Sequence, residues 1–326
     1  MPSLEHFELQ HNGTEHGWSG RGNIGSSNKP LFHTPPARLK VAILEQIQSS
    51  RLFTSPECPQ LVGLTCLKLK LAPVLPSLEG FNALLAASPM LEILSIDLRY
   101  QRRDSFPSAS SRPGSNPLPK VKLPNLRSLG LLFRARPYSI DWEYDMLRML
   151  DAPNVRFLRF RLLGWSSKNK DVVDYLAKGS DLSNPRPLFP LLVGLDIFVG
   201  QWIDQYLLGS GFYLLYEVMF TAYPFLTTLT LLGRAWSDVF ELRQWSLPNL
   251  ERLLVDSASP LGLKAFINGR HDAGLGLETL EILLVSKSHR EHIMSQFKEA
   301  LDGLGVDVRF CHTTQRAHEI MGLEDW

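Results

Sequence analysis

Cysteine is scarce in this chain, with only Cys58, Cys66 and Cys311 in 326 residues. An odd, sparse set without a CxxC pair excludes both a disulfide framework and a paired-cysteine zinc site as the basis of the fold. The sequence therefore indicates a protein of a reducing compartment.

An excess of charge of one sign is also lacking. Lys and Arg number 34 against 33 Asp and Glu, which gives a formal net charge of +1. This balance argues against a chain-wide attraction to nucleic acid or to an anionic membrane. No run approaches the ~18 apolar residues of a membrane span, and no basic start precedes an apolar segment. We expect a cytoplasmic or nuclear protein that does not bind membranes.

No catalytic or metal-binding motif occurs together with the other residues that its chemistry would require. Residues 20–25 spell GxGxxG, but Leu44 stands where a kinase would carry its phosphate-pairing lysine, and no HRD or DFG follows. His289 and His292 lack the i, i+4 spacing of a zincin, and no GxSxG elbow is present. The sequence predicts no enzyme, no cofactor and no metal site.

The chain does contain a short sequence motif, here called the phrase, that occurs nine times. It is usually a proline, any one residue and then an apolar residue, with two more apolar residues three and five positions after the first. Its first apolar residues are spaced by 24 (226 to 250) to 57 (4 to 61) positions, and the long gap corresponds to about two repeats. The phrases are Leu4..Phe7..Leu9, Leu61..Leu64..Cys66, Leu91..Leu94..Ile96, Leu126..Leu129..Leu131, Val155..Leu158..Phe160, Leu192..Leu195..Ile197, Leu226..Leu229..Leu231, Leu250..Leu253..Val255 and Leu280..Leu283..Val285.

Each phrase starts a short strand, because its last two apolar residues alternate with a polar or small one. Between phrases the apolar spacing becomes helical, as at 78–85, 142–150, 172–176, 212–220 and 288–301, with a last strand at 306–310. A strand–helix pair buries its apolar face only by stacking on its neighbours. The sequence predicts an α/β solenoid over residues 1–310, with a parallel β-sheet on its concave face, loop insertions at about 11–37 and 100–120, and a tail at 311–326.

The L-x-x-L-x-L core of the phrases resembles the leucine-rich repeat of the irregular, helix-bearing kind. The asparagine expected three residues after the last leucine appears only as Asn12, so no ladder of such asparagines is expected. Phrases such as SPMLEIL and LPNLRSL resemble the repeat region of fungal-like F-box/leucine-rich-repeat proteins. That resemblance implies a ubiquitin-ligase substrate receptor that binds a protein target. No F-box is present, so we expect a chain that begins within the solenoid, and a cullin-type ligase adaptor as partner only if an F-box exists upstream.

Two groups of residues are the candidate partner-binding surface. Side chains between or just after the last two apolar residues of a strand are expected to line the concave face. A tryptophan follows a glycine just past three consecutive strands and would form a rim, unless each indole only covers its own repeat's core. The candidates are Asp97, Arg159, Arg161, Asp196, Thr230 and Asp256 on the strands, and Trp165, Trp202 and Trp236 on the rim.

Two alternatives remain open. The chain could be a stand-alone leucine-rich-repeat scaffold, or an inactive fragment without a ligase role. The segment 99–136 carries nine Lys and Arg residues, and Asp104 is its one acidic residue, so it could bind an acidic or phosphorylated partner or nucleic acid. Because it lacks interleaved aromatic residues, a solvated loop is the favoured interpretation of that segment.

Overall fold

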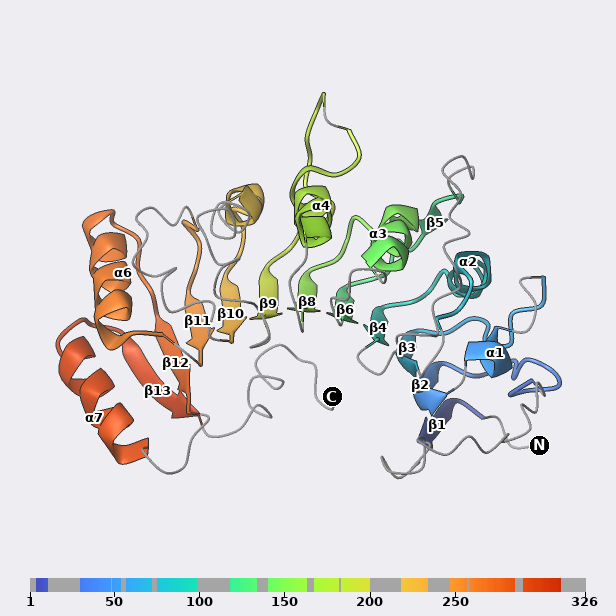
Figure 1. Cartoon of the computed structure of the whole chain (residues 1–326), viewed down its shortest axis with the longest axis horizontal. Coiled ribbons are helices and arrows are strands. Elements are labelled where there is room, and N and C mark those ends of the chain that lie inside the picture. Colours follow the sequence, from blue (N-terminus) through green and yellow to red (C-terminus); the bar gives the residue numbers. More distant parts are fainter. Residues whose placement is uncertain are drawn as a thin grey trace. The chain divides into compact units, whose positions relative to one another are not determined.

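The computed structural model describes residues 4–10, 30–47, 49–53, 57–71, 75–98, 118–133, 140–162, 167–181, 183–199, 218–233, 247–256, 258–284 and 290–311. The chain forms two compact units, Met1–Asn154 and Val155–Trp326. Each unit is an α/β layer of parallel strands and helices (Figure 1).

The described residues of the first unit form five parallel strands that pair with their neighbours in sequence order, and helices α2 and α3 lie on one side of them (Figure 1). Two short strands, β5 and β7, form a separate parallel pair. The elements are β1 (His6–Gln10), β2 (Val41–Ile47), α1 (Ser49–Leu52), β3 (Cys66–Leu71), α2 (Leu78–Ala86), β4 (Ile93–Asp97), β5 (Val121–Lys122), β6 (Ser128–Phe133), α3 (Ile140–Met149) and β7 (Leu150–Asp151).

The described residues of the second unit form six parallel strands, again paired in sequence order. Its elements are β8 (Phe157–Leu162), α4 (Ser167–Lys178), β9 (Gly194–Val199), β10 (Thr228–Leu232), β11 (Arg252–Val255), α6 (Pro260–Asp272), β12 (Thr279–Leu283), α7 (Arg290–Leu301) and β13 (Asp307–Cys311). In the described part of each unit, the parallel strands pair in sequence order, which confirms the predicted α/β class and is consistent with a leucine-rich-repeat-like solenoid.

The apolar residues of the phrases lie in register across the strands. In the first unit Leu67 pairs with Leu94 and Leu94 with Leu129. In the second unit the corresponding row is Leu158, Leu195, Leu229, Leu253 and Leu280. All of these leucines are buried, and each fully buried leucine contributes about 1.5–3 kcal/mol. The second apolar residues of successive phrases therefore form a continuous buried row in the core of each unit.

The second and ninth phrases were assigned the wrong register from the sequence. Leu67 rather than Leu64 pairs with Leu94, so the second phrase is Leu64..Leu67..Leu69. Leu280 pairs with Leu253, which is the second apolar residue of its own phrase, so the last phrase is Leu277..Leu280..Ile282. Leu283 belongs to the opposite face of the strand. Three leucines spaced by three residues fit either reading, and only the ladder distinguishes them.

The long gap between the first two phrases contains one further repeat, as its length predicts. Leu39, Ala42 and Leu44 are buried at the three phrase positions, and Ala42 pairs with Phe7 on one side and with Leu67 on the other. An alanine at the second position hides this repeat from a search for large apolar residues.

The proline of the phrase occupies the second position of a β-turn. The amide of Leu126 donates to the carbonyl of Leu123 across Pro124, and the amide of Leu250 donates to the carbonyl of Leu247 across Pro248. Proline suits this position because its φ is already set for the turn and no amide proton is needed there. The proline therefore shapes the turn that leads into each strand, beyond stopping the preceding helix.

The described helices agree with the helical spacing at 78–85, 142–150, 172–176 and 288–301, where α2, α3, α4 and α7 lie. Ser77 caps α2 by accepting from the Gly80 amide at 3.0 Å, and Ser259 caps α6 in the same way from Gly262 at 3.3 Å. Helix α6 was not anticipated from the sequence, and part of the segment 212–220 lies outside the described residues.

The predicted loops and tail are described only in part. Residues 30–37 of the first insertion contain no helix or strand, and the amide of Leu31 donates to the carbonyl of Arg51 at 3.1 Å. Residues 11–29, 100–117 and 312–326 lie outside the described residues, while Cys311 ends β13.

Candidate functional site

The candidate strand residues of the second unit stand on the sheet face that alternates with the leucine core. One row crosses the strands through Arg159, Asp196, Thr230 and Leu254. The next row, nearer the carboxyl ends of the strands, contains Arg161, Phe198 and Leu232. Residues from different strands become neighbours because the parallel ladder holds them in register.

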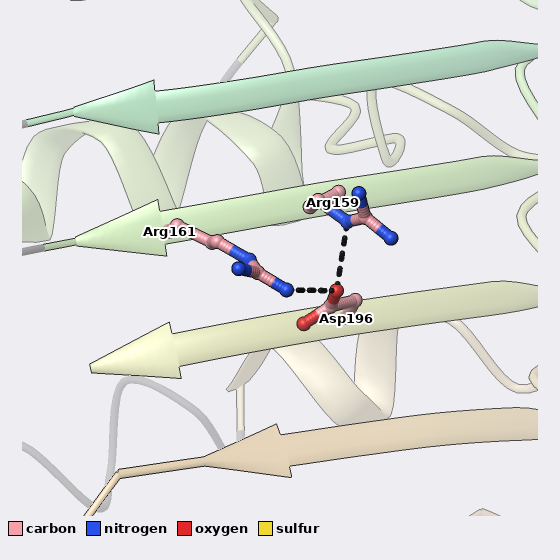
Figure 2. Close-up of polar contacts among 3 residues, drawn as sticks. All are labelled: Arg159, Arg161 and Asp196. Atoms are coloured by element: carbon pink, nitrogen blue, oxygen red, sulfur yellow. Dashed lines mark hydrogen bonds and ion pairs between the residues drawn. The ribbon is translucent and has the colours of Figure 1, made fainter. Parts of the chain in front are cut away.

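Two arginines of β8 converge on one carboxylate of β9 (Figure 2). Arg159 donates from Nε to Asp196 Oδ2 at 2.9 Å, and Arg161 donates from Nη2 to the same oxygen at 3.2 Å. The side chains of Arg159 and Asp196 are 1% and 0% exposed, and that of Arg161 is 16% exposed. We call Arg159, Arg161 and Asp196 the arginine–aspartate cluster.

Burial and like charge act on Arg159 in the same direction. Desolvation lowers the pKa of its guanidinium, the charge of Asp196 opposes this, and the charge of Arg161 lowers the pKa further. The guanidinium remains cationic, since an arginine side chain is effectively always protonated. The cluster thus places two cations against one shared carboxylate oxygen.

An apolar group lies beside this cluster on the same sheet face. Leu232, Leu254, Leu283 and Cys311 are buried together, and partly buried Phe198 packs against them. The Arg161 guanidinium lies over the Phe198 ring at 5.9 Å from its centroid. Phe198 therefore connects the charged and apolar parts of the face.

Most of the predicted strand residues are not exposed as an open contact surface requires. Asp97, Arg159, Asp196 and Thr230 are between 0% and 2% exposed. Their placement on the strands was correct, but their accessibility was not. Among the described candidates, only Arg161 and Asp256 are partly exposed.

Of these candidates, the structure brings Arg159, Arg161 and Asp196 into contact, and Thr230 pairs with Asp196 in the ladder. Asp97 belongs to β4 in the first unit. The rim tryptophans Trp165, Trp202 and Trp236 lie outside the described residues.

Asp256 stabilises a turn. Its Oδ1 accepts from the amide of Gly233 at 2.8 Å, and Gly233 has a φ of 106°, which favours glycine. This carboxylate fixes the backbone just past β10. Asp256 is thus a structural residue of the repeat, in addition to being a candidate contact.

Exposed polar residues of the second unit include a row at the strand starts that was not among the candidates. Thr228, Arg252, Thr279 and Asp307 lie in register there, and Arg252 and Asp307 are exposed. On this face, Arg161 and Phe198 are accessible at one end of the strands and the Arg252 row at the other, and Arg309 is exposed in the middle of β13. The period-2 pattern could have identified both groups.

The basic segment 99–136 is described only from 118 to 133. Within that part Lys120, Lys122 and Arg127 are exposed. The other cationic residues of the segment lie outside the described residues.

Two searches of the described residues gave no candidate. Within the ranges given above, no helix is long and apolar enough to cross a membrane. The same ranges contain no cluster of three or more His, Cys, Asp or Glu side chains arranged to hold a metal ion.

Comparison of the chain with models of known families, with curated proteins and with solved structures finds no significant match. The class of protein is accordingly defined by the fold alone, a repeat protein with a long parallel sheet.

Proposed function

We propose that this chain is a non-catalytic protein-recognition module that uses the strand ends of its second unit as contact surface. The observation that carries the proposal is the register of Arg161 beside Phe198, which combines a cation and an aromatic ring that are both partly exposed. Arginine and aromatic side chains dominate the energetics of many protein interfaces. Parallel repeats suit this role because each strand adds side chains to one continuous surface.

The repeat phrase supports a more specific form of this proposal. Its resemblance to F-box/leucine-rich-repeat proteins favours the substrate-binding part of a ubiquitin-ligase receptor, working in the cytoplasm or nucleus. A stand-alone scaffold without a ligase connection is the alternative. Ubiquitylation of a captured partner that depends on this chain would distinguish the receptor from the scaffold.

Charge reversal on opposite faces tests the recognition proposal. Arg252→Glu alters the exposed row at the strand starts, and Lys298→Glu alters an exposed position on helix α7. Proteins that co-purify with the tagged chain are quantified by mass spectrometry, and thermal unfolding is measured for each variant. We expect Arg252→Glu to lose partners that Lys298→Glu retains, with both variants folded. Equal partner sets for the two variants would contradict recognition through this face.

A further inference from the structure

Arg161 is held in a fixed orientation while part of it stays accessible. Asp196 Oδ2 accepts from its Nη2, and the Phe198 ring lies beneath its guanidinium. Its side chain is nevertheless 16% exposed. A guanidinium oriented in this way loses little side-chain entropy when it binds a ligand.

The charge of Arg161 is only partly balanced by Asp196. The same Oδ2 atom also accepts from Arg159, so one carboxylate oxygen serves two guanidiniums. Among the described residues, the buried Nε of Arg161 and the buried Oδ1 of Asp196 have no hydrogen-bond partner. A buried donor without a partner is rare in folded proteins, so the Nε of Arg161 points to a missing acceptor group.

Phe198 gives the site an apolar side. Its ring is partly exposed, and its inner edge packs on the buried group of Leu232, Leu254, Leu283 and Cys311. A ligand that reaches Arg161 therefore meets apolar surface one strand away, at a neighbouring-strand spacing of about 4.8 Å.

We propose that Arg161 and Phe198 form a recognition site for an acidic residue of a partner polypeptide, with the carboxylate on Arg161 and an adjacent apolar side chain on Phe198. This inference rests on the proposed recognition function and specifies the chemistry of the partner. Charge complementarity selects the occupant, because the partner's carboxylate adds the negative charge that the shared Asp196 oxygen supplies only in part.

A carboxylate suits the site better than a phosphate group. A phosphorylated side chain carries about −1.5 to −2 charges at pH 7, whereas a carboxylate carries one. The cluster of two guanidiniums and one carboxylate has one positive charge in excess, which a single bound carboxylate balances, whereas a phosphate group leaves an excess of negative charge. The chemistry therefore favours aspartate or glutamate in the bound segment.

The test uses the full chain and a phage-displayed library of random 12-residue peptides. Selected peptides are synthesised, and their Kd values are measured by fluorescence polarisation. We expect the selected sequences to share an acidic residue next to an apolar one. Arg161→Gln weakens binding about tenfold or more, the effect of removing a charge-assisted hydrogen bond, and Arg161→Lys weakens it less. Lys298→Gln, at an exposed position of helix α7, changes Kd less than about twofold and serves as the matched control.

A double-mutant cycle separates direct contact from a loss of folding. Replacing the peptide's acidic residue by its amide weakens binding to the wild-type chain, but adds little in Arg161→Gln if the two groups touch. Additive effects would overturn the proposal. Tighter binding of a phosphoserine peptide than of the carboxylate peptide would overturn it as well.

The outcomes also separate the inference from the function on which it rests. Selected peptides without an acidic residue, whose binding is lost in Arg252→Glu, would refute the proposed acidic-residue site and support recognition through the face. If the wild-type chain enriches no peptide, peptide recognition and the acidic-residue site are both refuted. The amide substitution in the peptide is measured on the wild-type chain, so it remains decisive even if Arg161→Gln does not fold.

Discussion

The side-chain amide of Asn154 donates to the backbone carbonyl of Pro124 in the preceding repeat, at 2.7 Å. Asn249 makes the same contact with Pro224 at 2.8 Å, and Asn125 makes a longer one with Pro89 at 3.5 Å. Each of these asparagines directly follows the proline of its own phrase. The asparagines thus connect consecutive turns before the strands. The asparagine ladder that the sequence was expected to lack would instead lie after the last leucine of each phrase.

These contacts predict a graded loss of stability. Asn249→Ala removes a short hydrogen bond and should lower the free energy of unfolding by about 1 kcal/mol, the usual net value of such a bond. Asn125→Ala removes the longest of the three bonds and should cost less. Urea denaturation of both variants checks the order, and a larger loss for Asn125→Ala would contradict the assigned role.

Gly179 ends α4 in a conformation and a space that only glycine fits. Its φ is +68°, and a Cβ atom at this position would lie 2.6 Å from the carbonyl oxygen of Arg186. Gly274 has a similar φ of +71°, but no atom lies within 4 Å of the corresponding Cβ position. Gly274→Ala should therefore cost about 1–2 kcal/mol, from the backbone conformation alone.

Gly179→Ala should cost clearly more than Gly274→Ala, because the steric clash with the Arg186 carbonyl adds to the conformational cost. The comparison is made by thermal and chemical unfolding of the two variants. Equal losses would show that the loop at Arg186 moves away without cost.

Arg270 connects helix α6 to two neighbouring segments. Its guanidinium donates to the carbonyls of Leu247 at 2.8 Å, Leu250 at 3.0 Å and Gly276 at 2.9 Å. The residue is 4% exposed, and burial lowers the pKa of its guanidinium. Its hydrogen bonds therefore stabilise the turn before β11 and the segment after α6 together.

We predict that Arg270→Met lowers the free energy of unfolding by at least about 3 kcal/mol, because several charge-assisted hydrogen bonds to buried carbonyls are lost. Arg309→Met is the matched control, since its side chain is 54% exposed, and it should change stability by less than about 0.5 kcal/mol. Similar unfolding curves for the two variants would contradict the role of Arg270.

The three cysteines should differ in reactivity. Cys58 is exposed, whereas Cys66 and Cys311 are buried. Burial raises the pKa of the Cys66 thiol, and the charge of Lys68 opposes this in part. The Cys311 thiol donates to Glu281 Oε2 at 3.1 Å. Because the thiolate is the reactive form, both burial and a raised pKa slow alkylation.

A thiol reagent should therefore label Cys58 rapidly in the native protein, and label Cys66 and Cys311 only after unfolding. The raised pKa also gives Cys66 a pH dependence of known sign. Its contribution to stability is complete below the ordinary thiol pKa and declines as the pH rises through the higher folded-state value. Peptide mapping of the labelled sites checks the order, and rapid native labelling of Cys66 would contradict it.

Much of the fold could be predicted from the sequence because the strand phrase carries its own register. Apolar residues at +3 and +5 from the first apolar residue fix which side of each strand faces the core, as Leu94 and Ile96 illustrate. Errors arose where this local signal is ambiguous. Ala42 is small enough to hide a repeat. Two leucine series, Leu61, Leu64 and Leu67 and also Leu277, Leu280 and Leu283, each fit two registers until the ladders with β4 and β11 are known.

The site was harder to predict, because accessibility depends on neighbouring chain segments as well as on strand alternation. Alternation correctly placed Arg159 and Asp196 on the face away from the core row, but it could not show that they are buried against each other. Apolar residues at outward positions, such as Leu232 and Leu254, do carry a signal. A strand that is apolar on both faces indicates a sheet that is covered on both.

The most direct test of the central claim is site-specific photo-crosslinking in cells that express the protein. A photoreactive residue replaces Phe198 on the strand face or Asn268 at an exposed position of α6, and crosslinked proteins are identified by mass spectrometry. Recognition through the strand face predicts a protein crosslinked from position 198 and absent from position 268. The same crosslinks from both positions, or crosslinks from position 268 alone, would contradict it.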